Sequence, residues 1–457
     1  MEAKRVYFVG IGGIGMAALA RYYLSKGYSV AGYDRAPSAL THALEHEGAV
    51  ISYEDSLDAI PEEFRAPGSA LVVYTPAVHP GNVPLDYFNA HQFPVLKRSA
   101  VLGLITKGSK GLCFAGTHGK TTTSSMAAHI LHNSPVGCNA FLGGILRNYD
   151  SNLLLSDTSP YSVIEADEYD RSFHTLTPYI AIITATDPDH LDVYGNEENY
   201  LESFAHFTEL IRPDGYLIIH EGLKLKPRPA ATVKTYTYSR DHGDFHAENV
   251  RYGNGTIVFD FVAPDTVIRD VELGVPVEIN IENAIAAMAA CHLTGQAPEE
   301  CMRRAMATFQ GAERRFQFML KEPGENGRVI IDDYAHHPDE LKTSIRSVRQ
   351  LYPGRKLTVA FQPHLYSRTR DFAPQFAEAL SMADEVVLTD LYPAREAPIP
   401  GISSKTIFDL VNCREKSLIS KEDFVKTMKN RNFEVLLSLG AGDLSTYLPQ
   451  LVKELKN

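Results

Sequence analysis

The stretch Leu112-Cys-Phe-Ala-Gly-Thr-His-Gly-Lys-Thr-Thr-Thr123 decides the fold of this chain. Its first four residues form an apolar run typical of a buried strand, glycines follow at once, and a helical pattern begins near Lys120. A phosphate-binding loop occupies this place between a strand and a helix. The alternative, a glycine-rich bend with a solvated lysine, is weaker because Gly-Lys-Thr at a helix start is a specific pattern.

This loop departs from the usual pattern because Phe114 stands where the first glycine belongs, so the loop is shorter or differently wound. We expect its backbone amides to cradle the phosphates of ATP, while Lys120 reaches the β and γ phosphates and the Thr121 hydroxyl coordinates Mg²⁺. The residues predicted to bind ATP here are Gly116, Thr117, His118, Gly119, Lys120, Thr121 and Thr122.

Short apolar runs alternate with longer helical patterns along the whole chain, which is typical of parallel α/β sheets. The chain has 457 residues, more than one hydrophobic core normally serves, so we expect three α/β domains. A flexible polar stretch at 107–111 and a segment at 316–321 would join them, giving domains 1–107, 108–318 and 319–457. The expected strands are 6–9, 70–74, 162–164, 180–184, 329–331, 358–361, 385–388 and 435–439.

A second glycine-rich loop follows the strand 6–9, and the later strand 29–32 is followed by Asp34. Glycines at this spacing allow a diphosphate to approach a helix N-terminus, because a β-carbon would block it. The nucleotide stays open among NAD, FAD and UDP, and a purely structural turn is the weaker alternative. The residues predicted to bind it are Gly12, Gly13, Ile14, Gly15 and Asp34.

The composition of the chain excludes several kinds of binding partner and cellular location. A formal net charge of -12 without a basic block argues against nucleic acid. Five cysteines without CxxC spacing indicate neither a disulfide framework nor a zinc site, and no apolar run is long enough for a bilayer. The start imitates a secretory signal, but its glycines fit the loop described above. We therefore expect a cytoplasmic protein without membrane insertion, as a monomer or weak homodimer.

Two acidic clusters follow expected strands, at 165–170 and at 187–192. The carboxyl ends of strands in an open parallel sheet form the ligand-binding edge, so these acids would face the phosphates. A lone acidic cluster is more often a solvated loop, but two beside a phosphate loop favour metal binding. We assign Glu165 and His190 to a second Mg²⁺, which would neutralise crowded phosphates and a carboxylate.

The last third of the chain carries weaker signals. Asn280 and Asn283 precede a small-residue helix, where a helix cap is the plain alternative. The segment 332–338 places two acids and two imidazoles after a strand, and 362–370 places two arginines after another. An arginine at such a place is either a surface ion pair or the partner of a substrate carboxylate or phosphoryl group.

Taken together and in this order, these motifs resemble those of the Mur ligases over essentially the whole chain. The quoted segments are 10–15, 116–123, 165–168, 187–192, 280–283, 315–316, 333–338, 362–370 and 390–396. The resemblance implies a Rossmann-like UDP-binding domain, a central P-loop ATPase-type domain and a C-terminal Rossmann-like domain that brings an amino acid. Relatives often carry Asn at Ala185, His at Ile279 and Arg at Leu365, so the chain departs from the pattern there.

The resemblance also implies roles for particular residues. Asn280, Asn283, Arg315 and Asp333 would complete the nucleotide site. Lys120, Glu165 and His190 would be catalytic, with Thr121, Glu165 and His190 as metal ligands. The residues implied to bind the amino acid are His336, His337, His364 and Arg368.

The function implied is that of an ATP-dependent ligase. It would phosphorylate the lactyl carboxylate of UDP-N-acetylmuramate and join the acyl phosphate to L-alanine, in peptidoglycan precursor synthesis, hence cell-wall biogenesis, cell shape and division. The first alternative is a Mur-like ligase that recycles a murein tripeptide. A nicotinamide dehydrogenase is a further alternative, but it leaves Lys120 and the acidic clusters without a role, and a folylpolyglutamate synthase leaves the N-terminal glycine loop without one. A nonenzymatic nucleotide sensor is a third class, which tight ATP binding without substrate-stimulated hydrolysis would favour.

Overall fold

The computed structural model describes residues 4–188, 191–253, 255–312, 316–324, 326–394 and 396–456. The chain forms two compact units. The first unit contains Met1–Ala247, Phe261–Ile268 and Glu282–Met306, and the second contains Glu248–Asp260, Arg269–Ile281 and Ala307–Asn457. Each unit is built around parallel β-sheet, so the predicted α/β class is confirmed.

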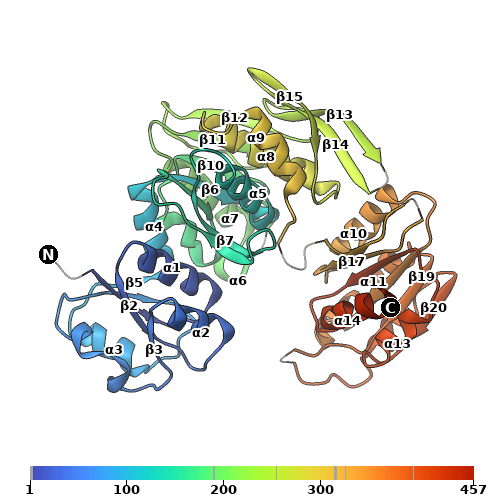
Figure 1. Ribbon diagram of the computed structural model, residues 1–457, viewed down its shortest axis with the longest axis horizontal. Coiled ribbons are helices and arrows are strands. Elements are labelled where there is room, and N and C mark those ends of the chain that lie inside the picture. The colour runs from blue at the N-terminus through green and yellow to red at the C-terminus, as the bar shows by residue number, and fades with distance from the viewer. Residues whose placement is uncertain are drawn as a thin grey trace. The chain divides into compact units, whose positions relative to one another are not determined.

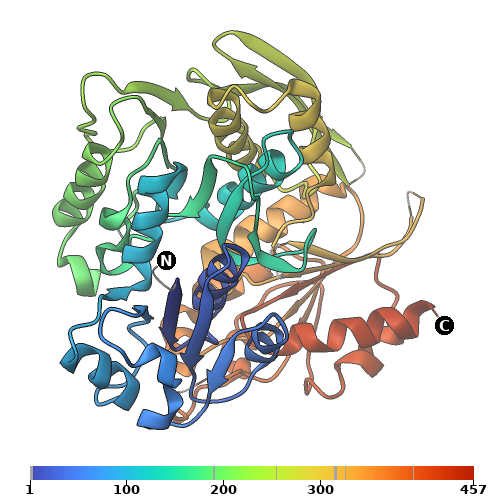
Figure 2. The ribbon, with the colours of Figure 1, turned by 60° about the vertical axis from the view of Figure 1, so that its left-hand side comes forward.

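The first unit begins with a five-stranded parallel sheet in the order β3-β2-β1-β4-β5. Alternate side chains of β1 point to opposite faces. Val6 and Phe8 pack in the cluster that includes Leu19 of α1, while Tyr7 packs with Phe88 of α3 on the other face. Figures 1 and 2 show the ribbon of this sheet and its helices. The elements are β1 (Arg5–Val9), α1 (Ile14–Ser25), β2 (Ser29–Tyr33), α2 (Ala39–His46), β3 (Val50–Ser52), β4 (Leu71–Tyr74), α3 (Val83–Ala90) and β5 (Val95–Lys97).

A seven-stranded sheet follows, in the order β12-β11-β10-β6-β9-β7-β8. Strand β6 lies between β10 and β9 and is parallel to both, so the loops after these three strands meet at one edge. The strands are β6 (Lys110–Ala115), β7 (Asn139–Leu146), β8 (Ser151–Leu154), β9 (Tyr161–Glu165), β10 (Ile180–Ile183), β11 (Tyr216–His220) and β12 (Lys234–Tyr238). The helices of this part are α4 (Arg98–Gly108), α5 (Lys120–His132), α6 (Leu191–Tyr194), α7 (Glu197–Glu209), α8 (Ile279–Leu293) and α9 (Glu299–Thr308).

A three-stranded sheet, β13 (His246–Gly253), β14 (Thr256–Ala263) and β15 (Thr266–Glu272), was not among the expected strands. Polar residues interrupt its segments, so they lack the continuous apolar runs by which the parallel strands were found.

The second unit contains a six-stranded sheet in the order β16-β17-β21-β18-β19-β20. All its pairs are parallel except β16 with β17, which form an antiparallel hairpin. The strands are β16 (Gln317–Lys321), β17 (Val329–Asp333), β18 (Leu357–Phe361), β19 (Glu385–Leu388), β20 (Glu415–Leu418) and β21 (Val435–Leu439). The helices are α10 (Pro338–Leu351), α11 (Tyr366–Leu380), α12 (Ser404–Phe408), α13 (Phe424–Lys429) and α14 (Leu448–Lys456).

Both expected connecting segments lie within or between regular elements, and their role as domain boundaries or hinges stays a prediction. Helix α4 continues to Gly108 and β6 starts at Lys110, leaving Ser109 alone between them. Residues 317–321 are strand β16, fixed by its ladder with β17. Only the first of these segments is polar in composition; the second is mostly apolar and is held in the sheet by its ladder with β17.

No helix in the described part of the chain is long and apolar enough to cross a bilayer. All five cysteines are free thiols, and burial raises the pKa of the Cys138 thiol to about 12.

Candidate active site

The phosphate loop lies at the end of β6, and glycine is required at two of its positions. Gly116 has φ +139°, and a β-carbon there would lie 2.2 Å from Oγ1 of Thr184 and 2.7 Å from the amide nitrogen of Ala185. Gly119 has φ +84° and is the N-cap of α5, so Lys120 is the first helical residue. Left-handed backbone and close packing both exclude a side chain at these places.

Side chains around the loop tie it to the segment after β10. The Thr117 amide donates to the Ala185 carbonyl at 3.1 Å, and Oγ1 of Thr117 donates to the Asp187 carbonyl at 2.7 Å. Oγ1 of Thr117 also lies 2.9 Å from the Tyr200 hydroxyl of α7. The Thr117 amide and hydroxyl therefore both hold the loop in shape, which leaves the other backbone amides of the loop to bind a phosphate.

Lys120 is held by two acceptors. Its Nζ donates to the Gly116 carbonyl at 2.6 Å and to Oε1 of Glu168 at 2.8 Å. The side chains of Lys120 and Glu168 are 14% and 2% exposed, so this ion pair is almost fully removed from water. The sequence placed Glu168 in an acidic cluster after β9, but did not single it out as the partner of Lys120.

Glu165, the last residue of β9, lies beside the start of α5. Oγ1 of Thr121 donates to Oε1 of Glu165 at 3.1 Å, and the Gly143 amide of β7 donates to Oε2 at 3.0 Å. Burial raises the pKa of the Glu165 carboxyl, while the charge of Lys120 and the hydrogen bond from Thr121 act in the opposite direction. Two predicted metal ligands, one hydroxyl and one carboxylate, are thus brought into contact.

These oxygen donors suit a hard cation such as Mg²⁺. Within the described ranges, no group of three or more His, Cys, Asp or Glu side chains is arranged to hold a metal ion. The third predicted ligand, His190, lies outside the described residues, as does the predicted nucleotide residue Arg315. The oxygen atoms of Thr121 and Glu165 therefore suit Mg²⁺ as ligands, and the remaining ligands stay a prediction.

The two asparagines predicted for the nucleotide site lie inside the first turns of α8, which begins at Ile279, and do not precede the helix as expected. Oδ1 of Asn283 accepts a hydrogen bond from Thr123 of α5 at 3.1 Å, and a β-carbon on Gly119 would lie 2.8 Å from the same oxygen. The Asn280 side chain instead donates to the Val275 carbonyl at 3.0 Å. Asn283 is therefore at the phosphate loop, whereas the Asn280 amide bonds to the backbone.

In the N-terminal loop, Asp34 is engaged with the backbone. Its Oδ2 accepts from the Gly12 amide at 2.7 Å, and its Oδ1 accepts from the Arg35 amide at 2.8 Å. A β-carbon on Gly15 would lie 2.2 Å from a terminal nitrogen of Arg98, the first residue of α4. Asp34 therefore fixes the loop, and Arg98 places a guanidinium against it that the sequence analysis missed.

The predicted amino-acid residues of the second unit fall into two groups. The rings of His336 and His364 are edge to face at 6.2 Å, and His364 stacks on Tyr392 at 5.7 Å. Nδ1 of His364 and Nη1 of Arg368 are buried and find no hydrogen-bond partner in the parts of the chain that are described. Burial, then the charge of Arg368, lowers the pKa of His364. His337 is the N-cap of α10 and packs its ring on Phe372 at 5.2 Å.

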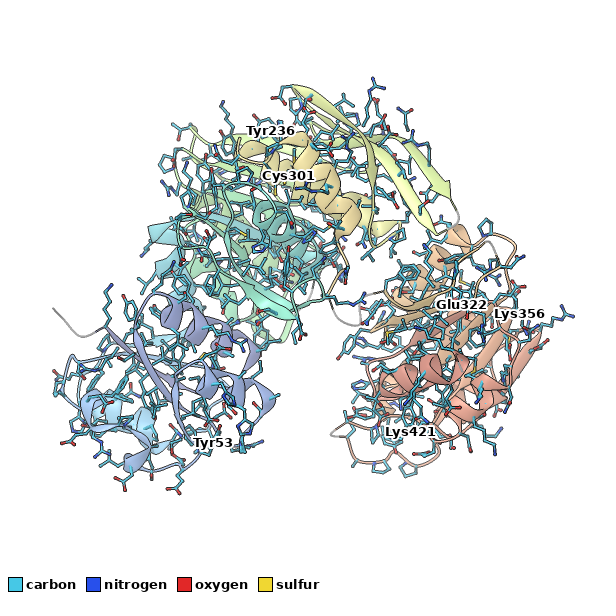
Figure 3. All side chains as sticks on the ribbon, viewed as in Figure 1. Tyr53, Tyr236, Cys301, Glu322, Lys356 and Lys421 are labelled. Atoms are coloured by element: carbon cyan, nitrogen blue, oxygen red, sulfur yellow. The ribbon has the colours of Figure 1, made fainter. Side chains whose placement is uncertain are left out.

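Buried bonds position the segment that carries His364. Gln362 is 1% exposed, donates to Asp443 at 2.8 Å and accepts from the Leu444 amide at 2.9 Å. Oδ2 of Asp443 also lies 2.6 Å from Nζ of Lys421, a residue that Figure 3 labels. Leu365, the residue before α11, has φ +70°, a strained value for a branched side chain.

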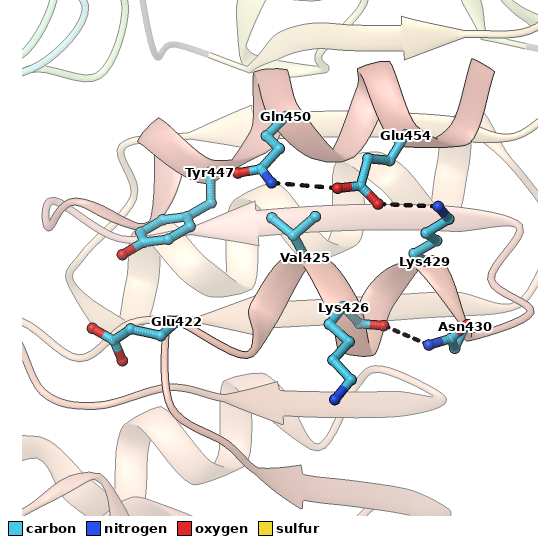
Figure 4. Close-up of a pocket in the computed structure, with 8 residues that line it drawn as sticks. All are labelled: Glu422, Val425, Lys426, Lys429, Asn430, Tyr447, Gln450 and Glu454. Carbon is cyan, nitrogen blue, oxygen red and sulfur yellow. Dashed lines mark hydrogen bonds and ion pairs between the residues drawn. The ribbon is translucent and has the colours of Figure 1, made fainter. Parts of the chain in front are cut away.

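Asp333 ends β17 and is predicted to contact the nucleotide. It accepts hydrogen bonds from the Ser344 hydroxyl and, at 3.4 Å, from the Phe316 amide. A pocket of about 480 Å³ lies elsewhere in this unit, between α13 and α14 (Figure 4). No predicted site residue lines it; its lining residues are Glu422, Val425, Lys426, Lys429, Asn430, Tyr447, Gln450 and Glu454.

Comparison with known families covers nearly the whole chain. Residues 5–110 match the Mur ligase family, catalytic domain; residues 114–291 match the Mur ligase middle domain; and residues 314–443 match the Mur ligase, glutamate ligase domain. The chain belongs to the Mur ligase family. The predicted resemblance is confirmed, as are the three-domain architecture and the class of ATP-dependent ligase.

Individual Mur ligases are similar over their full length. The UDP-N-acetylmuramate--L-alanine ligase of Parabacteroides distasonis is 59% identical over 455 residues, which cover 99% of this chain and 97% of the relative. The crystal structure of UDP-N-acetylmuramate-alanine ligase MurC from Thermotoga maritima is 27% identical, with a TM-score of 0.77 and 99% of both chains covered. A murein peptide ligase from Psychrobacter arcticus shares the fold, at 20% identity and a TM-score of 0.60 over 99% of both chains.

Membership of the Mur ligases rules out the dehydrogenase and sensor interpretations. The domain bounds at 107–108 and 318–319 and the individual site roles stay predictions. Two of the departures from the family pattern are at exposed or strained places, because Ile279 is 50% exposed and Leu365 has a positive φ. At the third, Ala185 contributes its backbone carbonyl to the loop, a contact that any residue can make.

Proposed function

We propose that this chain is an ATP-dependent ligase that joins L-alanine to the lactyl carboxylate of UDP-N-acetylmuramate, through an acyl phosphate, in peptidoglycan precursor synthesis. The observation that carries the proposal is its full-length likeness to ligases of that name. The geometry of the phosphate loop agrees with it. Because ATP and the UDP-linked substrate are cytosolic compounds, we place the reaction in the cytoplasm.

Phosphoryl transfer mainly requires positioning and neutralisation of charge. The loop amides other than that of Thr117, which donates to the Ala185 carbonyl, would hold the β and γ phosphates at the N-terminus of α5, where the helix dipole favours anions. The Lys120 ammonium, already fixed beside the loop, would take up charge that develops on the γ phosphate. The lactyl carboxylate would then attack the phosphorus atom and ADP would leave.

Thr121 is the residue that we propose for one Mg²⁺, and Glu165 and His190 are those that we propose for a second. When bound, the two ions would neutralise the phosphates and the incoming carboxylate, which otherwise repel each other. Glu165 must be ionised for this role, and the hydrogen bonds from Thr121 and Gly143 stabilise its charged form.

The UDP end of the substrate would bind at the N-terminus of α1. The amides of Gly13, Ile14 and Gly15 are at the start of this helix, which is 12 residues long and has no acidic residue in its first turn. Since both oxygens of Asp34 accept backbone hydrogen bonds, we assign Asp34 to shaping the loop that receives the diphosphate.

The alanine end would bind in the second unit. The buried Nη1 of Arg368 requires an acceptor, because an unsatisfied buried donor costs about 1 to 3 kcal/mol, and Nδ1 of His364 also lacks a partner among the described residues. The carboxylate of an amino acid is a suitable acceptor, and an arginine can bind it through two parallel hydrogen bonds. Because an acyl phosphate hydrolyses in water, the substrates have to be enclosed before the amine attacks.

The test is phosphate release by the purified chain with UDP-N-acetylmuramate, ATP and Mg²⁺, and either L-alanine or the murein tripeptide. We expect release that depends on L-alanine, with the product lengthened by one residue in a mass spectrum. Equal or faster release with the tripeptide would replace the proposal by the recycling ligase. The Lys120→Ala variant should release less than about one hundredth as much phosphate, and comparable rates would contradict the role of the loop.

A further inference from the structure

We propose that Glu168 is a positioning residue that orients the Lys120 ammonium toward the γ phosphate of ATP. This inference rests on the proposed function, because it concerns the phosphoryl transfer step. Glu168 would not contact the reacting atoms itself, and would act through Lys120.

The number of donors on the lysine supports this role. An ammonium group has three N–H donors. Two are used inside the protein, one by the Gly116 carbonyl at 2.6 Å and one by Oε1 of Glu168 at 2.8 Å. A single donor remains for a ligand, and two fixed contacts determine its direction. A free lysine side chain would instead lose rotamer entropy, up to about 2 kcal/mol, each time that it aligned with a phosphate.

Glu168 is itself held at a fixed place. Its carbonyl accepts hydrogen bonds from the Tyr194 hydroxyl at 2.5 Å and from the Arg171 amide at 3.0 Å. Two residues earlier, the Ala166 amide donates to the carbonyl of Phe114 in β6 at 2.9 Å. The backbone of Glu168 is thus anchored both to α6 and to the strand that leads into the phosphate loop, and its buried carboxylate is held by the contact with Lys120.

The burial of Glu168 indicates a role beyond stability. Its side chain is 2% exposed, and Oε2 has no hydrogen-bond partner among the residues for which the structure gives positions. Burying a carboxylate with an unsatisfied oxygen destabilises a fold, and an apolar pair of similar size often does better than a buried ion pair. A second negative charge close to a triphosphate site also opposes the binding of ATP. Both costs are explained if the carboxylate aligns Lys120.

This role predicts a split between binding and turnover. Glu168→Gln keeps an acceptor for Lys120 but removes the negative charge. An ammonium binds a neutral acceptor less firmly than a carboxylate, so Lys120 should lose its fixed direction. We expect kcat to fall roughly 100-fold, the effect that a displacement of about 1 Å in a catalytic group has. The dissociation constant for ATP should stay the same or decrease, because a repulsive charge has been removed. Glu168→Asp keeps the charge on a shorter side chain and should recover part of the lost kcat.

The matched control is Asp170→Asn, two residues along the chain. Asp170 pairs with Lys97 at 3.2 Å, but both side chains are about half exposed, so this ion pair should contribute little. The control removes one carboxylate from the same segment and should leave kcat, ATP binding and the melting temperature near those of the parent.

The experiment measures alanine-dependent phosphate release, ATP binding by calorimetry and the melting temperature of all four proteins. A low kcat with undiminished ATP affinity in Glu168→Gln, partly recovered in Glu168→Asp, supports the inference. A kcat of Glu168→Gln equal to that of the parent overturns the inference. The inference is also overturned if weaker ATP binding or loss of folding explains the whole loss of turnover in both variants. Absence of release from the parent protein would be a failure of the proposed function instead.

Discussion

Replacing Gly143 by alanine would push a methyl group into the carboxylate of Glu165. A β-carbon on Gly143 would lie 2.2 Å from Oε2 and 2.7 Å from Cδ of Glu165. Carbon and oxygen in contact stand about 3.3 Å apart, so the carboxylate has to retreat by about 1 Å. It would then lose the hydrogen bond from the Gly143 amide, now 3.0 Å long, and its alignment with Thr121.

The expected effect is on catalysis and not on folding. A hydrogen bond to a charged group contributes about 1.5 to 3 kcal/mol, and a misplacement of about 1 Å lowers the rate roughly 100-fold, or about 2.7 kcal/mol in activation free energy. Gly143 is exposed and has no left-handed backbone angle, so alanine causes no backbone strain there. The melting temperature of Gly143→Ala should therefore stay within a few degrees of the parent value.

The assay is phosphate release with saturating UDP-N-acetylmuramate and L-alanine, measured over a range of Mg²⁺ concentrations. Higher concentrations of Mg²⁺ should restore part of the activity if Glu165 binds the ion. The matched control is Gly108→Ala at the end of α4, where a β-carbon would meet nothing within 4 Å. Turnover of Gly143→Ala within threefold of this control would refute the contact between Gly143 and Glu165 as a determinant of activity.

Three further changes have separate readouts. Asp34→Ala should raise the KM for UDP-N-acetylmuramate several-fold and leave that for ATP unchanged, because the Gly12 amide loses its acceptor; equal increases in both constants would contradict this role. Arg368→Gln should raise the KM for L-alanine roughly 10- to 100-fold, the effect of losing one charge-assisted hydrogen bond, and an unchanged KM would remove Arg368 from the alanine site. Burial lowers the pKa of His129 to about 4, so the folded chain binds fewer protons than the unfolded chain between about pH 4 and 6.5, and stability is lost as the pH falls through this range. Between pH 7 and pH 5, the free energy of unfolding measured with urea should therefore fall by about 2 kcal/mol less in His129→Gln than in the parent. An equal fall in both proteins would count against a buried neutral imidazole.

The sequence was sufficient for those parallel strands that are continuous apolar runs between helical patterns. The parallel strands β3, β5, β11, β12 and β20 were not among the expected strands, and β12 and β20 are polar. Strands β19 and β21 have the bounds expected, and β1, β4, β9, β10, β17 and β18 differ by a residue or two at their ends. The position of Lys120 at the start of a helix after β6 also followed from local pattern. The pairing of 317–321 with β17 did not follow, because local composition gives no information about which strand a segment pairs with.

The sequence alone determined the order of the elements, the two glycine-rich loops and the residue types available for phosphate, metal and carboxylate binding. These properties are local, since they depend on periodicity and on the backbone freedom of glycine. Tertiary structure decided the partners: Glu168 for Lys120, Gly143 for Glu165, Gly12 for Asp34. Such pairs join residues 22 to 48 positions apart, and only the packing of separate strands and helices brings their side chains within hydrogen-bonding distance.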